Sequence, residues 1–315
     1  MKLPSVPGGR KRRKRIDTFA RVCYHTRERD AKEYAVTMRW NETAIFCDLD
    51  GTLFDHFGKV SPKNRRAIEA YTRAGGLFAI ATGRCPSNMM QYLEGVAFNA
   101  PCIVLNGAGV YDRKTDRFLF TEFADRDALA AVLRYAQKEL PSVNLQVYTP
   151  EDILYVSPKE TLNVPFWELH KTSRFLSIEE AEAYPWFKAL LFGTPEQMRR
   201  ADRWIEEQGL SPRFDRVFVS TDIVPGSYYL ELLPKGVNKG SALKTCRSLL
   251  PFLGRTMIGV GDYNNDLEML AEADLAAVPE NGHPDAVQLA DTVLPSNDDD
   301  AIAALIERIP GMKRP

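Results

Sequence analysis

The stretch AIFCDLDGTLFD at residues 44–55 joins an apolar run to two carboxylates one residue apart, Asp48 and Asp50. The run predicts a buried strand over residues 44–47. Because residues i and i+2 of a strand face the same side, the two carboxylates are expected to point toward one reacting group. A D-x-D-G pattern alone is more often structural than catalytic. The calcium-loop pattern fails here, since Thr52 and Leu53 occupy its fifth and sixth positions.

Strands and helices alternate on both sides of this stretch. Short apolar runs at residues 77–81 and 102–105 are typical of strands covered on both faces. Residues 62–74 predict a helix with Ser61 as N-cap and Pro62 at its first position. This order predicts an α/β fold with a parallel, Rossmann-like sheet. The same pattern returns near the C-terminus, with helices over residues 239–250 and 266–273 and strands over 256–260, 275–278 and 292–294.

The middle of the chain has a different texture, in which proline, aromatic and charged residues separate the elements. Helices are expected over residues 127–139 and 195–208, and strands over 145–148 and 189–192. A strand at residues 228–233 is expected to lead back to the first pattern. We therefore expect an inserted α+β domain over residues 113–221, within a core formed by residues 38–112 and 222–315.

The first 37 residues carry a basic hexamer at residues 10–15, RKRRKR. Such a run occurs in nucleic-acid patches and localisation signals. The surrounding polar sequence favours a basic, disordered N-terminal extension over residues 1–37.

Bulk composition excludes several classes of protein. The 41 basic and 42 acidic residues give a net charge of −1, so no whole-protein field attracts nucleic acid or an anionic membrane. The five cysteines are widely spaced and odd in number, which indicates neither a disulfide framework nor a zinc cluster. No run of about 18 apolar residues is present to cross a membrane. The expected location is the cytoplasm.

Polar residues follow the predicted strands at several points. Asp48 and Asp50 follow the first strand, Thr82 and Gly83 the second, and Asp262 a later one. Ligands of open parallel sheets bind at the carboxyl ends of the strands, so these residues are expected to converge. Clustered carboxylates repel one another unless a cation lies among them, and oxygen ligands of this kind suit Mg²⁺. Thr82, Gly83 and Lys239 supply donors for an anion.

Taken together, these stretches resemble the haloacid dehalogenase (HAD) superfamily of phosphatases, in its Cof-type subgroup (class IIB) with a large α/β cap. The resemblance runs through most of residues 44–309. The matching segments, in chain order, are FCDLDGTL (46–53), AIATGR (79–84), IVLNGA (103–108), NKGSAL (238–243) and GVGDYNNDLEML (259–270). The family implies the HAD fold, with the inserted α+β domain as a cap that selects the substrate.

The resemblance also implies catalytic and metal-binding roles. Asp48 would be the nucleophile that forms an aspartyl phosphate, and Asp50 the general acid and then the general base. The carboxylate of Asp48, the backbone carbonyl of Asp50 and the carboxylate of Asp262 would bind Mg²⁺.

Other matched positions would bind phosphate or substrate. Asn265 would contact the phosphate or a metal-bound water, and Asp266 would orient Lys239 or the metal ligands. Arg84 would contact the substrate or support its loop. The full phosphate- and substrate-binding set is Leu49, Thr82, Gly83, Arg84, Lys239 and Asn265.

The function implied is a Mg²⁺-dependent phosphomonoesterase for a small soluble phosphate ester, such as a sugar phosphate or a phosphorylated cofactor. Two alternatives stay open: a phosphotransferase or phosphomutase that passes the phosphoryl group to another hydroxyl, and a non-catalytic phosphate-ligand-binding protein. The expected partner is a small phosphorylated metabolite, with no membrane and no nucleic acid beyond what the basic N-terminal segment suggests. The expected assembly is a monomer or a homodimer.

Overall fold

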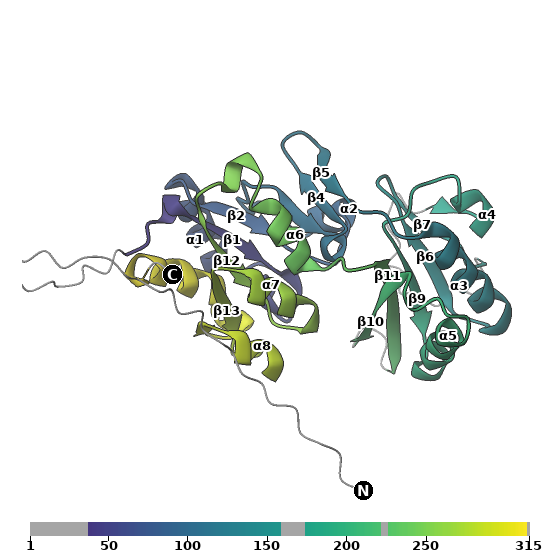
Figure 1. The fold of residues 1–315 in the computed structure, drawn as a ribbon. Helices are drawn as coiled ribbons and strands as arrows, with labels where there is room; N and C mark the ends of the chain where they lie inside the picture. The colour runs from purple at the N-terminus through teal and green to yellow at the C-terminus, as the bar shows by residue number, and fades with distance from the viewer. Residues whose placement is uncertain (1–36, 159–173, 222–225, 314–315) are drawn as a thin grey trace, which may run out of the picture. The chain divides into compact units, whose positions relative to one another are not determined.

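The computed structural model describes residues 37–158, 174–221 and 226–313, which belong to one compact unit (Figure 1). The expected basic extension lies outside the described residues.

A five-stranded parallel sheet forms the centre of the core. Its strands are ordered β14-β13-β12-β1-β2, and β1 pairs in parallel with both β12 and β2. All five residues of β1 are buried, which explains the continuous apolar run at the start of the stretch 44–55. The bounds are β1 Thr43–Cys47, β2 Leu77–Ile80, β12 Thr256–Val260, β13 Leu275–Pro279 and β14 Thr292–Leu294.

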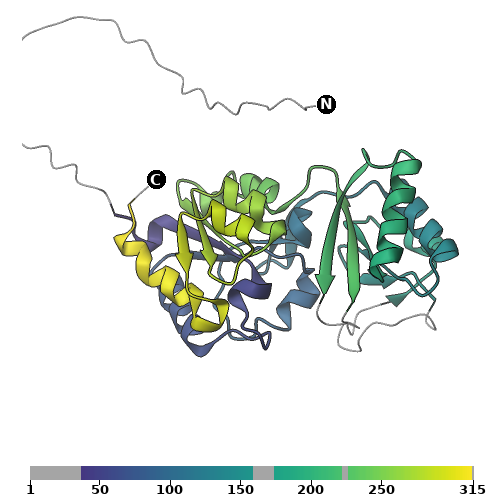
Figure 2. The same cartoon turned by 90° about the horizontal axis from the view of Figure 1, so that it is seen from below.

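Helices cover both faces of this sheet (Figures 1 and 2). Helices α6, α7 and α8 lie over one face, and α1 and α9 pack together over the other. The predicted Rossmann-like core is confirmed. The helices are α1 Pro62–Arg73, α6 Lys239–Cys246, α7 Leu267–Glu272, α8 Pro284–Leu289 and α9 Ala301–Arg308.

Helix starts were predicted better than helix ends. The Ser61 hydroxyl accepts a hydrogen bond from the Asn64 amide, as expected of an N-cap. Helix α6 was predicted to reach residue 250 but ends at Cys246, and a short 3-10 turn that contains Pro251 follows. Leu249, the N-cap of that turn, has an extended backbone (φ −80°, ψ 138°), so the α-helix does not continue through it.

The strand predicted at residues 102–105 differs from expectation. Strand β3 (Cys102–Val104) belongs to a three-stranded antiparallel sheet with β4 (Gly109–Asp112) and β5 (Arg117–Thr121). A parallel bridge between Ala81 and Ile103 joins β3 to the end of β2. This bridge places residues 105–107 beside the loop that follows β2.

Strands between residues 144 and 234 build a second layered unit around a six-stranded sheet, ordered β10-β11-β9-β6-β7-β8. Helices α3 (Arg126–Glu139) and α5 (Pro195–Glu207) pack together, and α5 contacts β9 and β11. Around Trp186 these elements share an apolar cluster of their own. The strands are β6 Asn144–Tyr148, β7 Ile153–Tyr155, β8 Arg174–Phe175, β9 Lys188–Gly193, β10 Phe214–Thr221 and β11 Ser227–Pro234.

Other residues of this sheet join the apolar cluster of the core. Tyr148, Leu190 and Phe192 belong to the same cluster as Leu49 and Val104. Strand β11 of this sheet lies wholly beyond residue 221, where the insertion was expected to end. The α+β cap is thus a distinct layer that packs against the core.

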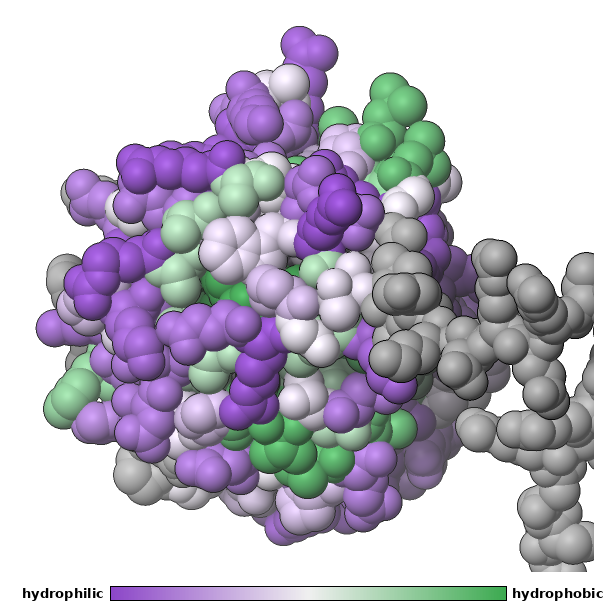
Figure 3. Space-filling model, turned by 90° about the vertical axis from the view of Figure 1, so that its left-hand side faces the viewer, coloured by the Kyte–Doolittle hydropathy of each residue, from purple (hydrophilic) through white to green (hydrophobic). Residues whose placement is uncertain are grey.

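The surface is mainly polar on the face shown in Figure 3, where hydrophobic residues gather in a few separate patches. Among the described residues, exposed large apolar side chains include Phe57, Leu250 and Leu253. In the same part of the chain, every helix is too short or too polar to cross a membrane.

Candidate active site

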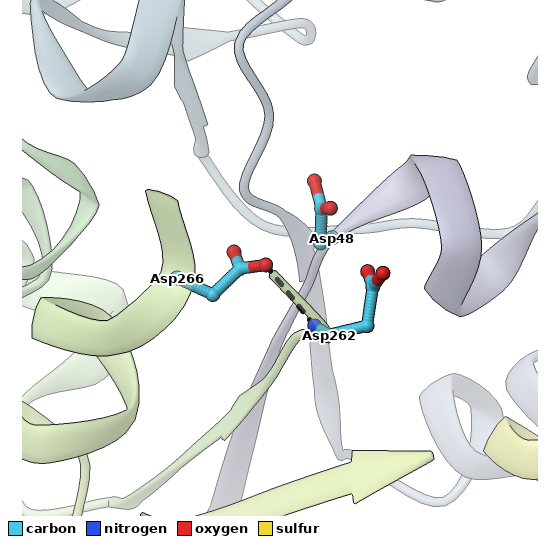
Figure 4. Close-up of side chains that lie close together, drawn as sticks. All are labelled: Asp48, Asp262 and Asp266. Atoms are coloured by element: carbon cyan, nitrogen blue, oxygen red, sulfur yellow. Dashed lines mark hydrogen bonds between the residues drawn. The ribbon is translucent and has the colours of Figure 1, made fainter. Parts of the chain in front are cut away.

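The carboxyl ends of β1 and β12 bring three carboxylates together (Figure 4). Asp48 directly follows β1, and its amide donates to the Val260 carbonyl at the end of β12 over 2.8 Å. Asp262 follows β12 two residues later, and Asp266 ends the next short turn. One oxygen from each of Asp48, Asp262 and Asp266 lies within 4.8 Å of the others.

Lys239 lies between two of these carboxylates. It is the first residue of α6, its side chain is fully buried, and its Nζ donates to Asp48 Oδ1 (2.8 Å) and to Asp266 Oδ1 (2.7 Å). Burial alone would lower the pKa of Lys239, but the charges of Asp266 and Asp48 outweigh it and raise the pKa above its usual value. Lys239 is therefore a fixed positive charge.

Asp266 holds its neighbours in place. Its second oxygen, Oδ2, accepts hydrogen bonds of 3.1 Å from the amides of Asp262 and Tyr263. Because the side chain turns back to these amides, residues 264–266 form a 3-10 turn, and α7 begins at Leu267, one residue later than predicted. Asp266 thus links Lys239 to the backbone that carries Asp262.

The third carboxylate is held by a residue that sequence reasoning did not assign. The Thr52 hydroxyl donates to Asp262 Oδ1 over 2.7 Å. Thr52 lies inside the DLDGT stretch, two residues after Asp50, so the motif itself points to this residue. Gly51, directly before Thr52, has φ +75°. A Cβ at this position would lie 2.4 Å from Asp262 Oδ2. Only glycine fits this turn.

The charges of this cluster do not balance. Three buried or half-buried carboxylates face one ammonium group. Burial, followed by the neighbouring carboxylates, raises the pKa of Asp48 well above its usual range. Burial also raises the pKa of Asp262 to about 6. A cation would relieve this repulsion, and a set of carboxylate oxygens fits a hard divalent ion such as Mg²⁺.

Two members of this cluster, Asp48 and Asp262, belong to the expected metal-binding set, and Asp266 is a third carboxylate beside them. The remaining expected ligand, the backbone carbonyl of Asp50, stays a prediction. The Asp50 side chain is engaged elsewhere, with both oxygens accepting from Arg84. The distances are 3.0 Å from Nε to Oδ2 and 2.7 Å from Nη2 to Oδ1.

Asp48 and Asp50 both lie beyond the end of the strand from which their shared orientation was expected. Strand β1 ends at Cys47, and Leu49–Leu53 form a tight turn in which the backbones of Asp50 and Gly51 are not helical. The Asp50 side chain remains 60% exposed, whereas Asp48 is buried. The turn, and not strand alternation, sets the relation between the two carboxylates.

Aromatic rings flank Arg84. Its guanidinium carbon lies 4.6 Å from the ring centroid of Tyr92 and 5.7 Å from that of Phe54. Two hydrogen bonds to the Asp50 carboxylate and two neighbouring aromatic rings restrict the orientation of this guanidinium. Arg84 therefore orients Asp50 in this structure.

The loop after β2 is closely wrapped by residues 105–107. The amides of Leu105 and Asn106 donate to the carbonyls of Arg84 (3.0 Å) and Thr82 (3.1 Å). The Arg84 amide in turn donates to the Thr82 hydroxyl over 3.2 Å. Leu105 and Asn106 have φ values of +56° and +53°, an uncommon conformation for residues other than glycine. Such strain persists where packing enforces it.

Asn106 was not predicted as a site residue, although IVLNGA was noted. Its Oδ1 accepts from Asn265 Nδ2 (3.3 Å), and its Nδ2 donates to Glu231 Oε2 (2.8 Å). Asn265 therefore lies beside the loop that carries Thr82 and Gly83. The Leu49 side chain is buried in the apolar cluster, so a contact from Leu49 to a ligand would come from its backbone.

Cys47 lies one residue before Asp48 and is fully buried. Its thiol donates to the Asp48 carbonyl over 3.1 Å. Burial, followed by the charges of Asp48 and Asp266, raises the pKa of this thiol well above its usual value.

Comparison with known proteins bears on this geometry. Residues 45–306 match a family of haloacid dehalogenase-like hydrolases. A protein of Thermotoga maritima with a known crystal structure superposes with a TM-score of 0.71 at 25% identity, over 85% of this chain and 97% of that one.

Two curated relatives match 84% of this chain each. A Bacillus subtilis 5-amino-6-(5-phospho-D-ribitylamino)uracil phosphatase is 23% identical over 297 residues and is covered over 97% of its length. The chloroplastic endoribonuclease YBEY of Arabidopsis thaliana is 26% identical over 278 residues, but the chain spans only 46% of that protein.

Proposed function

The chain belongs to the haloacid dehalogenase-like hydrolases, and from this we propose that it is a Mg²⁺-dependent phosphomonoesterase that works through an aspartyl phosphate on Asp48. The observation that carries the proposal is the buried cluster of Asp48, Asp262 and Asp266 around Lys239.

Asp48 is the proposed nucleophile. Lys239 holds Asp48 Oδ1, so Oδ2 is the oxygen that would attack phosphorus while the bond from phosphorus to the ester oxygen breaks. A proton from Asp50 would go to the leaving alcohol oxygen. Water would then attack the phosphorus of the aspartyl phosphate, Asp50 would take its proton, and the Asp48 carboxylate would be restored with release of inorganic phosphate.

Three groups would bind the transferring phosphoryl group. They are the Thr82 hydroxyl, the Gly83 amide and the Lys239 ammonium. Mg²⁺, held by Asp48, the Asp50 carbonyl and Asp262, would neutralise the charge that builds up during transfer. Asp266 would keep Lys239 and the backbone at Asp262 in place.

The substrate we propose is a small soluble phosphate ester, such as a sugar phosphate or a phosphorylated cofactor. The cap, with its six-stranded sheet, would choose the alcohol and exclude water from the transfer step. The relative from Bacillus subtilis named above acts, by its name, on a phosphorylated ribityl compound, which belongs to this class. Phosphorylated metabolites are abundant in the cytoplasm, and we place the activity there.

Phosphate release from a panel of phosphate esters tests the proposal. The wild type and Asp48→Asn would be assayed with Mg²⁺ and with EDTA. Asp215→Asn serves as a matched control, because Asp215 lies in strand β10 and pairs with Lys235, just after β11. We expect turnover by the wild type and the control with Mg²⁺ only, and a loss of at least about 10³-fold in Asp48→Asn.

Other results would count against it. Full activity in Asp48→Asn would rule out the aspartyl phosphate. An isomeric ester in place of free phosphate would instead indicate a phosphomutase.

A further inference from the structure

A buried lysine of the cap reaches the phosphate-binding loop, and the reaction described above does not use it. Lys188 is the first residue of β9 and is 1% exposed. Its Nζ donates to the Gly83 carbonyl over 3.1 Å and lies 3.0 Å from Glu231 Oε1. The ammonium also lies 4.6 Å from the ring centroid of Tyr148. Fully buried lysines are rare and need such partners.

Glu231 links Lys188 to Asn106. It lies in β11, its side chain is 13% exposed, and its Oε2 accepts from Asn106 Nδ2 over 2.8 Å. Asn106 Oδ1 accepts in turn from Asn265. A continuous set of polar contacts therefore runs from two cap strands to both sides of the proposed phosphate site.

A contact at the Gly83 carbonyl can affect the Thr82 hydroxyl through the neighbouring amide. It belongs to the same peptide group as the Arg84 amide, which donates to the Thr82 hydroxyl over 3.2 Å. An ammonium on the carbonyl polarises the peptide and strengthens the bond at its amide. That bond occupies a lone pair of the Thr82 oxygen, which leaves its proton free to point toward a phosphate.

The loop has little freedom to adjust on its own. A Cβ at Gly83 would lie 2.9 Å from Asn106 Oδ1, so the two segments are in close contact. Asn106 is also held in a left-handed conformation. Removal of the lysine would leave Glu231 buried without its cation and would disturb Asn106 as well as Gly83.

We propose that the Lys188–Glu231 pair is a positioning element through which the cap holds the phosphate-binding loop and Asn106 in the binding arrangement. The proposal rests on the proposed phosphatase function and extends it. The cap would contribute to phosphoryl binding for every ester, and not only to the choice of alcohol.

The test compares Lys188→Met, Lys188→Arg and Glu231→Gln with the wild type. Arg216→Met is the matched control, because Arg216 forms ion pairs with Asp202 and Glu206 within the cap. Steady-state kinetics would use p-nitrophenyl phosphate and a sugar phosphate, with inorganic phosphate as product inhibitor. Thermal denaturation reports the stability of each variant.

We expect Lys188→Met to lower kcat/KM by about tenfold or more, as for loss of a hydrogen bond to a charged group. The factor should be the same for both esters, and inhibition by phosphate should weaken in parallel. Lys188→Arg should restore part of the loss, since it keeps the charge, and Arg216→Met should behave as the wild type.

Two results would overturn the proposal. A loss confined to the sugar phosphate would mean that Lys188 contacts the alcohol part of the substrate. A lower melting temperature with unchanged kinetics would mean a structural role only.

A separate readout distinguishes this proposal from the proposed function. Hydrogen exchange of the peptide that contains the Arg84 amide needs no substrate, and it should be faster in Lys188→Met and Glu231→Gln than in Arg216→Met. If the wild type releases no phosphate, the phosphatase function fails while this exchange result still decides whether the pair holds the loop. Equal exchange in all variants would reject the positioning role.

Discussion

At Asp50 the chain has left the strand, and this single change of geometry decides how the proposed acid is oriented. A buried strand residue would have faced the same side as Asp48, but the turn at Leu49–Leu53 lets the Asp50 carboxylate meet Arg84. The turn itself depends on Gly51. The orientation of the acid is therefore a property of the turn and of one guanidinium.

Replacement of Arg84 tests this orientation. In Arg84→Met the Asp50 carboxylate loses two hydrogen bonds, and we expect kcat for phosphate ester hydrolysis to fall by about tenfold or more. Arg84→Lys should restore little, because an ammonium cannot supply the two parallel bonds of a guanidinium. Asn88→Ala is the control, since Asn88 accepts from Arg84 Nη1 and not from the two nitrogens that bind Asp50. Full activity in Arg84→Lys would contradict a role for the two parallel hydrogen bonds from Arg84 to Asp50.

Individual strands and helix starts could be predicted from the sequence, because their signals are local. The strands at β1, β6 and β9 and the start of α1 follow from apolar runs and from Ser61 and Pro62, which are local signals. The approach of Asp48 and Asp262 follows from strand order, because parallel strands end at one edge.

Contacts between distant elements carried no such signal. Thr52 binds Asp262 across 210 positions of sequence, and Lys188 reaches Gly83 across 105. Both contacts depend on how turns and the cap pack, which neither composition nor periodicity encodes. The sharp turn after Asp48 was missed for the same reason, since its shape depends on the close approach of Gly51 to Asp262.

The turn at Leu105–Gly107 is an element whose geometry can be tested. Gly107 has φ +101°, and a Cβ there would lie 2.2 Å from the carbonyl oxygen of Asn238, the N-cap of α6. Gly107→Ala should lower the free energy of unfolding by about 1–3 kcal/mol more than Gly209→Ala. Gly209 is a suitable control because it has φ +66° but open space around its Cβ.

Gly107→Ala and Gly209→Ala should also differ in catalytic activity. Displacement of Asn238 would move the start of α6, and with it Lys239, so Gly107→Ala should also lose turnover while Gly209→Ala keeps it. Chemical denaturation and phosphate release measure the two effects. Equal stability of the two variants would mean that the turn has room to relax.

In the whole molecule, charge balance at the strand ends couples metal binding to folding. Asp48, Asp262 and Asp266 come from segments more than 200 residues apart in the chain, and the folded core alone brings them together. Their mutual repulsion opposes folding until a cation binds.

Added Mg²⁺ should therefore stabilise the protein. At a concentration one hundred times the dissociation constant, the gain for one site is about 2.7 kcal/mol. Thermal denaturation should show a melting temperature that rises with Mg²⁺ and falls back with EDTA. Asp262→Asn should be more stable than the wild type without the ion and should respond weakly to it, whereas a wild-type melting temperature independent of Mg²⁺ would argue against the metal site.

The buried thiol of Cys47 has a consequence for the durability of the enzyme. Oxidants and alkylating reagents attack the thiolate, and burial keeps Cys47 protonated and out of their reach. A sulfur atom can thus stand one residue from the proposed nucleophile without making the site a target of peroxide, so oxidative stress would spare the position on which turnover depends.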